Sequence, residues 1–368
     1  LSMVDTFAGV GSDADMNDFR AESRRLAAAL MAATPPPNSG FAMLPSMLAL
    51  FGNDPEMAER TMSASWSSAD PWTVSALAMG RMLFAENEGR PADMRTDVDL
   101  AMVGFERIGD RWGQSSVLAT RGNLRAMDGD TAGGIADYER ALTLAGELGS
   151  ADDEAMIRVR LAGLLMRIDE LDRAEAMLAG VRDQFDSRSQ GFDRHILVVA
   201  MQAMIRLLGG DQAGARELAG KLRADWNQRG TDLLQGHVLA IVSGVTAIVA
   251  VHTDEIDQAF ADVRAGYPIA VRTEDMPVVA TIGVAVAWVA AAVGRPAEAA
   301  RLLGASARLR GADDADDPLV ARLAGRLRAE LGAAYEECYW QGKALTRAGA
   351  IEAMNPDLAL DPSTVRRP

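Results

Sequence analysis

Few residues of this 368-residue chain have both the type and the spacing that catalysis or metal binding requires. The three histidines, His195, His237 and His252, lie in three different segments without the spacing of metal ligands. Cys338 is the only cysteine, and no histidine lies near it in the sequence to activate its thiol. The sequence therefore predicts structural or solvated roles for these residues, and no enzyme, metal or cofactor site.

A phosphate-binding loop is also absent from the sequence. Gly220-Lys221 and Gly342-Lys343 lack the upstream glycine spacing and the following Ser or Thr of such a loop. Acidic pairs such as Asp152-Asp153 and Asp313-Asp314 are typical of helix starts and loops. The chain is therefore expected to bind something rather than to catalyse a reaction.

One set of polar and basic side chains could bind a ligand. Helix positions separated by four, seven and eleven residues share one face. The candidates at such positions are Arg81, Arg121, Arg125, Arg158, His195, Gln202 and Arg206. On helices that are otherwise rich in alanine, these groups predict a groove for a small anionic ligand, or for a peptide or protein partner. The alternative is a solvated outer face that binds no ligand.

The elements that would carry these residues recur along the chain. A small residue, eleven intervening positions and a second small residue form five pairs, and the first members step by 40, 41, 44 and 40 residues. The pairs are Gly122/Gly134, Ala162/Ala174, Ala203/Ala215, Ala247/Ala259 and Ala287/Ala299. A turn signal with Gly, Asp or Pro separates the two members, as two helices joined by a tight turn require. Only Gly or Ala fits where such helices cross closely.

The repeat continues with less fidelity towards the N-terminus. Gly89-Arg90-Pro91 lies one period earlier between Met82 and Met94, and Gly52–Pro55 lies earlier still. Gly11–Asp13 could open a further unit, and residues 34–40 are expected to form a loop. The sequence therefore predicts six helical pairs, and a weaker signal indicates a seventh. We therefore expect an all-α fold, a solenoid of helical hairpins similar to tetratricopeptide (TPR) repeats, with a period of about 40 residues in place of 34.

The chain is expected to have four parts. Less regular helical repeats occupy residues 1–70, and the repeat array occupies residues 71–310. An acidic loop after Arg310 leads into C-terminal capping helices at about Pro318–Leu331 and Gly332–Met354, within residues 311–354. Residues 355–368 are expected to form a flexible tail.

Charge and cysteine usage limit the environment and the partners. A net charge of −15 repels phosphate backbones, so direct contact with nucleic acid is not expected. One cysteine and no signal peptide suit a cytoplasmic protein, and the start at Leu1-Ser2-Met3 suits an internal fragment of a longer one. Two uncharged runs, between Asp232 and Asp254 and between Asp275 and Arg295, approach the length of a membrane span. Because each falls at a fixed place in the repeat, we expect both to be buried in the array.

Several short motifs occur in a fixed order between residues 66 and 354. They read FERIGDRWG at 105–113, YERAL at 138–142, ELG at 147–149, DMPVVA at 275–280, AARLLGA at 299–305 and, after LG at 331–332 and Tyr335, GKAL at 342–345. In sequence and spacing they resemble the C-terminal repeat region of large antibiotic-pathway regulators of the AfsR/SARP type. Residues 11–52 match that family only loosely. Related arrays occur in LuxR-type ATPase regulators, so the branch is left open.

The resemblance implies a regulatory role. Regulators of this type place a winged-helix DNA-binding domain and a bacterial transcriptional activator domain (BTAD) first. An NB-ARC ATPase module follows, and the repeat array comes last. This chain would be the sensor array, which binds a ligand or partner and controls the upstream ATPase and DNA-binding domains. The alternative is a stand-alone TPR scaffold for protein–protein interaction.

Overall fold

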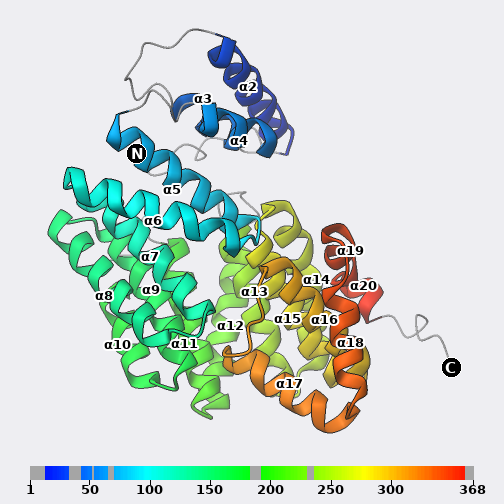
Figure 1. The fold of residues 1–368 in the computed structure, drawn as a ribbon. Coiled ribbons are helices and arrows are strands. Elements are labelled where there is room, and N and C mark those ends of the chain that lie inside the picture. The colour runs from blue at the N-terminus through cyan, green and yellow to red at the C-terminus, as the bar shows by residue number, and fades with distance from the viewer. Residues whose placement is uncertain are drawn as a thin grey trace.

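The computed structural model describes residues 13–32, 43–51, 54–64, 70–182, 192–229 and 236–360, and Figure 1 shows their arrangement. Within these residues every regular element is a helix, and they contain no strand. The all-α prediction is confirmed.

Six helical hairpins form the array. Their first helices begin at 71, 111, 151, 192, 236 and 276, so the spacing of 40 to 44 residues in the sequence is the spacing of the hairpins. The hairpins are α5 (Pro71–Asn87) with α6 (Pro91–Ile108), α7 (Arg111–Met127) with α8 (Thr131–Leu148), α9 (Ala151–Arg167) with α10 (Leu171–Arg182), α11 (Phe192–Leu208) with α12 (Gln212–Arg229), α13 (Gly236–His252) with α14 (Ile256–Thr273), and α15 (Met276–Ala292) with α16 (Pro296–Arg310).

The turns inside the hairpins share one backbone conformation. One residue in each turn has a positive φ, namely Gly89, Gly129, Asp169, Gly210, Asp254 and Gly294, with φ between 59° and 84°. This left-handed residue ends the first helix and is usually glycine, because a side chain is strained there. In four hairpins an aspartate or proline then starts the second helix, as with Asp130, which accepts a hydrogen bond from the backbone of Gly133, and in the other two Glu170 and Glu255 stand there.

The small residues lie where the two helices of a hairpin cross. A Cβ atom on Gly134 would lie 2.7 Å from the carbonyl oxygen of Gly122, and one on Gly122 would lie 3.0 Å from that of Gly134. The corresponding alanines in the later hairpins, Ala162/Ala174 to Ala287/Ala299, are fully buried. Close backbone approach therefore explains the small-residue pairs.

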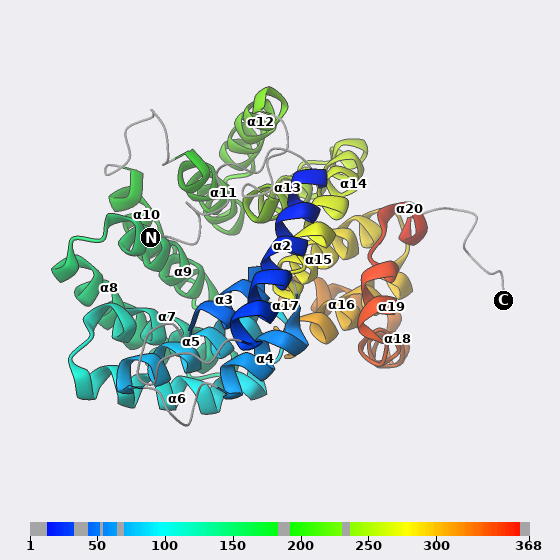
Figure 2. The same cartoon turned by 90° about the horizontal axis from the view of Figure 1, so that it is seen from above.

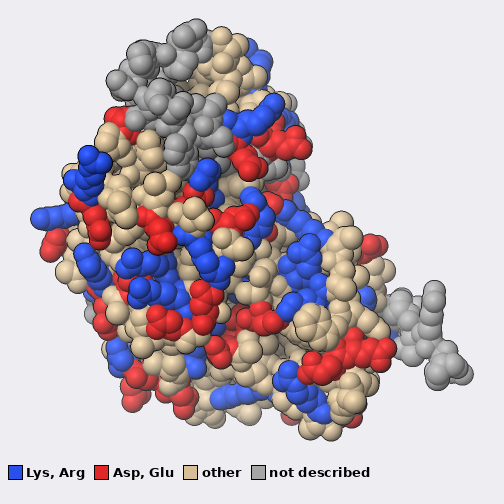
Figure 3. Space-filling view, viewed as in Figure 1, with Lys and Arg blue, Asp and Glu red and all other residues tan. Residues whose placement is uncertain are grey.

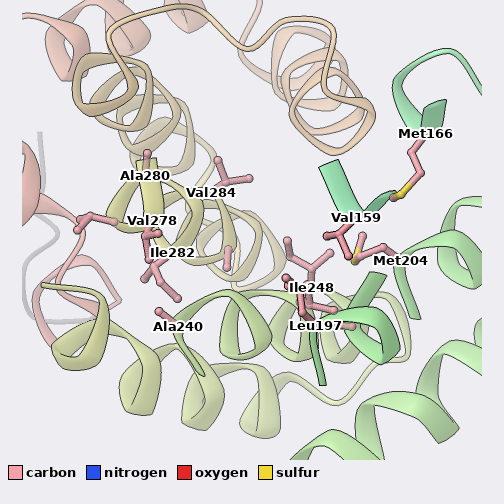
Figure 4. Packing of buried hydrophobic residues seen from close by; sticks show 14 of the residues in the cluster. Val159, Met166, Leu197, Met204, Ala240, Ile248, Val278, Ala280, Ile282 and Val284 are labelled. Atoms are coloured by element: carbon pink, nitrogen blue, oxygen red, sulfur yellow. The ribbon is translucent and has the colours of Figure 1, made fainter. Parts of the chain in front are cut away.

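The first helices are inside the array and the second helices are outside. Seen from above in Figure 2, the hairpins follow a clockwise curve from α5 low in the view, past α9 on the left, to α15 on the right, with the first helices on its inner side and their partners on its outer side. The buried core runs through all six hairpins. In Figure 4, Val159, Leu197, Ile248 and Val284 show how α9, α11, α13 and α15 contribute to it in turn.

The two uncharged runs correspond to α13 and α15, most of whose residues belong to the core or pack against it. Among the described helices, none is long and apolar enough to cross a membrane. Burial between neighbouring hairpins accounts for their apolar character on every side.

The helices of the N-terminal part are less uniform in length than those of the array. It contains α2 (Asp13–Ala32) and a short hairpin of α3 (Met43–Phe51) and α4 (Pro55–Ala64). Ala27, Ala49, Ala58 and Leu77 form a small apolar cluster separate from the main core. The predicted loop at 34–40, residues 11 and 12, and residues 52 and 53 of the predicted turn lie outside the described residues.

After the acidic loop comes α17 (Pro318–Leu331), and the chain then differs from the predicted helix boundaries. The expected second helix is divided into α18 (Ala334–Lys343) and α19 (Arg347–Ala353), because Thr346 caps α19 by accepting from the backbone of Gly349. The tail was expected to be flexible from residue 355. Instead, α20 (Pro356–Ala359) packs on the array, where Arg295 donates to the carbonyl of Ala359 at 2.8 Å. Residues 361–368 lie outside the described range.

Candidate functional site

The arginines that the sequence selected are held in ion pairs within their own hairpins. Arg81 of α5 pairs with the buried Asp97 of α6. One repeat later, Arg121 of α7 donates to both carboxylate oxygens of the buried Asp137 of α8, at 2.7 and 2.8 Å. Arg125 adds a contact to Asp137 at 3.3 Å. These side chains lie on the flank where a first helix packs against its second helix.

The other candidates have partners in the preceding hairpin, in their own helix or in the next turn, or are exposed. Gln202 donates to Glu175 of α10 at 2.7 Å, and Arg206 lies 3.6 Å from Asp211 in the next turn. Arg158 lies 3.8 Å from Glu154, and its buried Nε has no hydrogen-bond partner within the described chain. His195 is exposed in the first turn of α11. These contacts do not test ligand binding by any of these residues, which stays a prediction.

A second group of charged side chains reaches across the inside of the array. Glu86, near the end of α5, lies 3.7 Å from Arg160 of α9, two hairpins further on, and accepts from Asn123 of α7 at 3.3 Å. The side chain of Arg160 is 38% exposed, although the charge of Glu86 is close enough to raise its pKa. Only the inner side of a curved array brings α5, α7 and α9 together in this way, so these residues line its interior.

The start of α15 belongs to the same interior group. Asp275 caps α15 by accepting from Val278 at 3.1 Å and lies 3.6 Å from His237 of α13. Burial raises the pKa of Asp275, the hydrogen bond from Val278 and the charge of Arg160 oppose that rise, and the charge of Glu86 adds to it. The first and last hairpins of the array therefore share one electrostatic environment.

The acidic loop between α16 and α17 meets the interior at the end of α9. Asp314 accepts from Arg167, the last residue of α9, at 2.6 Å, and lies 3.3 Å from Arg310. Arg167 and Asp314 are 147 residues apart in the sequence and only 19% and 11% exposed. Burial disfavours the charge of Asp314, but Arg310 and Arg167 outweigh it and hold the pKa below its ordinary value.

Helix α17 extends this contact across the ends of two more first helices. Arg322 donates to the carbonyl of Leu208, the last residue of α11, at 3.4 Å. Arg326 donates to the carbonyl of Ala291 near the end of α15, at 3.2 Å. Free carbonyls at helix ends attract such cations. The loop of residues 311–317 and α17, here called the C-terminal closure, therefore cover the end of the interior at which α9, α11 and α15 end.

The C-terminal closure also contacts the first hairpin of the array. A Cβ atom on Gly311 would lie 2.0 Å from the carbonyl oxygen of Gly89, and both glycines have a positive φ. Next to them, Arg347 of α19 forms a two-pronged ion pair with Glu88, including Nη2 to Oε1 at 3.0 Å. Figure 1 shows the turn between α5 and α6 beside the start of this loop. The array is therefore closed on itself and not open-ended.

A shallow cleft lies on the outer side, between α12, α13 and α14. It has a volume of about 390 Å³, and its lining includes Arg223, Thr246 and Asp262. Arg223 donates to Asp262 at 2.8 Å and to the carbonyl of Thr246 at 3.0 Å, so its polar groups satisfy one another. Asp262 stands three residues after Ala259, as Asp137 does after Gly134, which makes it the same position of the repeat.

The described residues contain no group of three or more His, Cys, Asp or Glu side chains placed to hold a metal ion. Over the face in Figure 3, basic and acidic side chains are interspersed, with no single-sign field. The site that the geometry brings together is therefore the charged interior and its closure.

Comparison with known proteins gives a likeness of fold. No family model and no curated protein matches the sequence. The structure of a Rap protein complexed with Competence and Sporulation Factor is similar to the chain with a TM-score of 0.56 and 10% identity, over 89% of this chain and 94% of that one. A tetratricopeptide repeat protein from Parabacteroides merdae gives a TM-score of 0.49 and 15% identity, over 77% and 96% of the two chains. The expected TPR-like helical-hairpin solenoid is confirmed.

Proposed function

We propose that the chain is a regulatory, partner-binding module whose charged interior receives a ligand or a segment of another protein. The observation that carries the proposal is the group of charged side chains on the inner side of the array, where Glu86 of α5 meets Arg160 of α9 and Arg167 ends α9. A small anionic ligand or a peptide would find both charge and partial desolvation there. The Rap structure, complexed with a factor, supports the idea that a fold of this kind holds a partner.

The context proposed for the module is a multidomain transcriptional regulator. The motifs from FERIGDRWG to GKAL support this assignment, because they resemble the last part of AfsR/SARP-type proteins. In that context the array acts on an upstream ATPase module and DNA-binding domain, without contacting nucleic acid or membrane itself. The chain is proposed to be cytoplasmic and to carry no catalytic activity of its own.

Regulation requires two states that the ligand distinguishes. The closed array provides one of them, since Gly89 against Gly311 and Glu88 against Arg347 join its two ends. Releasing these contacts would let the curvature of the array relax and would give the second state. A ligand in the interior favours whichever curvature places its partners closer, and the upstream domains respond to that change.

A stand-alone scaffold for protein–protein interaction is the second candidate, and one observation favours it. Large exposed apolar side chains recur with the 40-residue period of the repeat. Trp72 and Trp112 lie at the starts of α5 and α7, and Ile108 and Leu148 lie at the ends of α6 and α8. Each is between 38% and 46% exposed. Exposed apolar rows of this kind mark protein interfaces more often than isolated exposed residues do.

The test begins with the coding DNA upstream of Leu1. A reading frame with a winged helix and a GxxxxGK[ST] module is expected, and a stop codon or an unrelated domain there would reject the regulator. If the domains are present, the ATP hydrolysis rate of the longer protein is compared with and without the array. Removing the array is expected to change that rate at least several-fold. An unchanged rate, with both proteins folded, would favour the scaffold, for which W72A/W112A is the informative double variant.

A further inference from the structure

The acidic loop occupies a position that an outside ligand could take. Its seven residues, 311–317, include four aspartates, and only Asp314 reaches both Arg167 and Arg310. We propose that the end of α9 is a binding site for an acidic segment of a partner protein, and that this loop fills the site as an intramolecular competitor. The proposal rests on the proposed partner-binding function and names the partner's chemistry.

The site selects for carboxylates because of what remains when the loop leaves. With the loop in place, Arg167 and Arg310 are only 19% and 23% exposed, and Asp314 is the carboxylate that pairs with both. An unpaired, partly buried cation is costly, and burial indeed opposes the charge of Arg167 while Asp314 and Asp317 favour it. Any segment that displaces Asp314 must therefore bring an anion of its own, and an apolar or basic segment cannot.

The loop is also poorly suited to stay in place. Burial, with the neighbouring charge of Asp314 added, raises the pKa of Asp317, so the two carboxylates disfavour each other. Asp316 and Ala315 are exposed and have no hydrogen bond or ion pair described. Asp313 pairs instead with Lys343 of α18, whose Nζ donates to it at 2.6 Å. One ion-paired residue, Asp314, therefore holds the middle of the loop in the site.

A partner peptide must compete for the site with a loop that is covalently tethered beside it. A loop of this length has an effective concentration in the millimolar range, so a free acidic peptide meets an occupied site. Neutralising Asp314 removes the competitor's anchor but leaves Arg167, Arg310 and the Asp317 cap of α17 unchanged. Such a variant should expose the site to a peptide added in solution.

The probe is a fluorescein-labelled peptide with the chain's own sequence from Gly311 to Pro318, GADDADDP, and its binding is read by fluorescence anisotropy. Asp314→Asn is expected to bind it at least 10-fold more tightly than the unaltered protein. Adding Arg167→Gln to that variant should return binding to background. Arg216→Gln, an exposed arginine of α12 that pairs with Glu255 at 2.6 Å, is the matched control and should leave binding unchanged. Thermal melts establish that each variant is folded, and the peptide should raise the melting temperature of Asp314→Asn alone.

Three results would overturn the proposal. The first is equal binding by Asp314→Asn and the unaltered protein, and the second is binding that persists after Arg167→Gln. The third is equal competition by inorganic phosphate or citrate at the same charge, which would assign the site to a small anion instead of a protein segment. None of these results bears on the ATPase comparison, so the failure of this inference and the failure of the proposed function are distinguishable.

Discussion

Alanine at Gly311 should open the array, and a matched glycine separates this effect from backbone strain. Gly311 has φ +77°, and Gly294 has φ +76°, so alanine meets the same left-handed strain at both, of about 1–2 kcal/mol. A Cβ at Gly294 has no atom within 4 Å, whereas one at Gly311 would lie 2.0 Å from the carbonyl oxygen of Gly89 and 2.6 Å from Cδ of Pro91. The Gly89 carbonyl and the Pro91 ring cannot move aside as a flexible side chain would. The turn between α5 and α6 must therefore separate from the loop that begins at Gly311.

The expected cost of that separation follows from the contacts it breaks. Overpacking of this kind costs about 1–3 kcal/mol, and loss of the half-exposed Glu88–Arg347 pair adds less than about 1 kcal/mol. Urea unfolding should therefore show Gly311→Ala less stable than Gly294→Ala by about 1–3 kcal/mol. Small-angle scattering should show a larger radius of gyration for Gly311→Ala only. Equal stabilities and equal radii for the two variants would refute closure of the array.

Three further predictions follow from single residues. Asp254→Gly should stabilise the fold by about 0.5 kcal/mol, because the φ of 59° at Asp254 is strained for a residue with a side chain. Gly294→Asp should destabilise it for the same reason, and thermal melts of the two variants measure both effects. Gly134→Ala should destabilise by about 1–3 kcal/mol, since its Cβ would lie 2.7 Å from a backbone oxygen, whereas Gly220→Ala, with open space, should gain about 0.5–1 kcal/mol in urea unfolding. In the wild type, the folded pKa of Asp317 is raised above 3.8, so the wild type loses stability as the pH rises through that folded pKa. Asp317→Asn keeps the cap of α17 and removes this carboxylate. The variant should be more stable by about 1 kcal/mol at pH 7, with the gain vanishing below pH 3.8, and a gain independent of pH would contradict this account.

The hairpins were predictable because their signals are local. A left-handed Gly or Asp is followed within two residues by Asp, Glu or Pro, and the small residues at the crossings lie twelve apart. The break between α18 and α19 had a similar local signal in Thr346 and was missed among the helix-forming residues around it. Propensity alone favours one long helix there.

The interior was not predictable to the same degree. A stripe at helical spacing shows which residues share a face but not which way that face points. Asn123 and Arg160 line the interior, and they stand only two residues from the selected Arg121 and Arg158, which on a helix is about 200° away. The partners that identify the inner side, such as Asp314 for Arg167, are far away in the sequence and leave no periodic trace.

The pairing of Glu88 with Arg347 joins residues 259 positions apart, and this changes how the molecule should fold. In an open solenoid each unit touches only its neighbours, so unfolding can start at either end and spread. Bringing two residues at this distance together from a random chain costs about 5 kcal/mol in entropy, more than an exposed ion pair returns. The junction must therefore form last, once stacked hairpins have already delivered the two ends to the same place. After that the protein has no free terminal unit in the array, and its amide hydrogens at both ends should exchange as slowly as those at its middle.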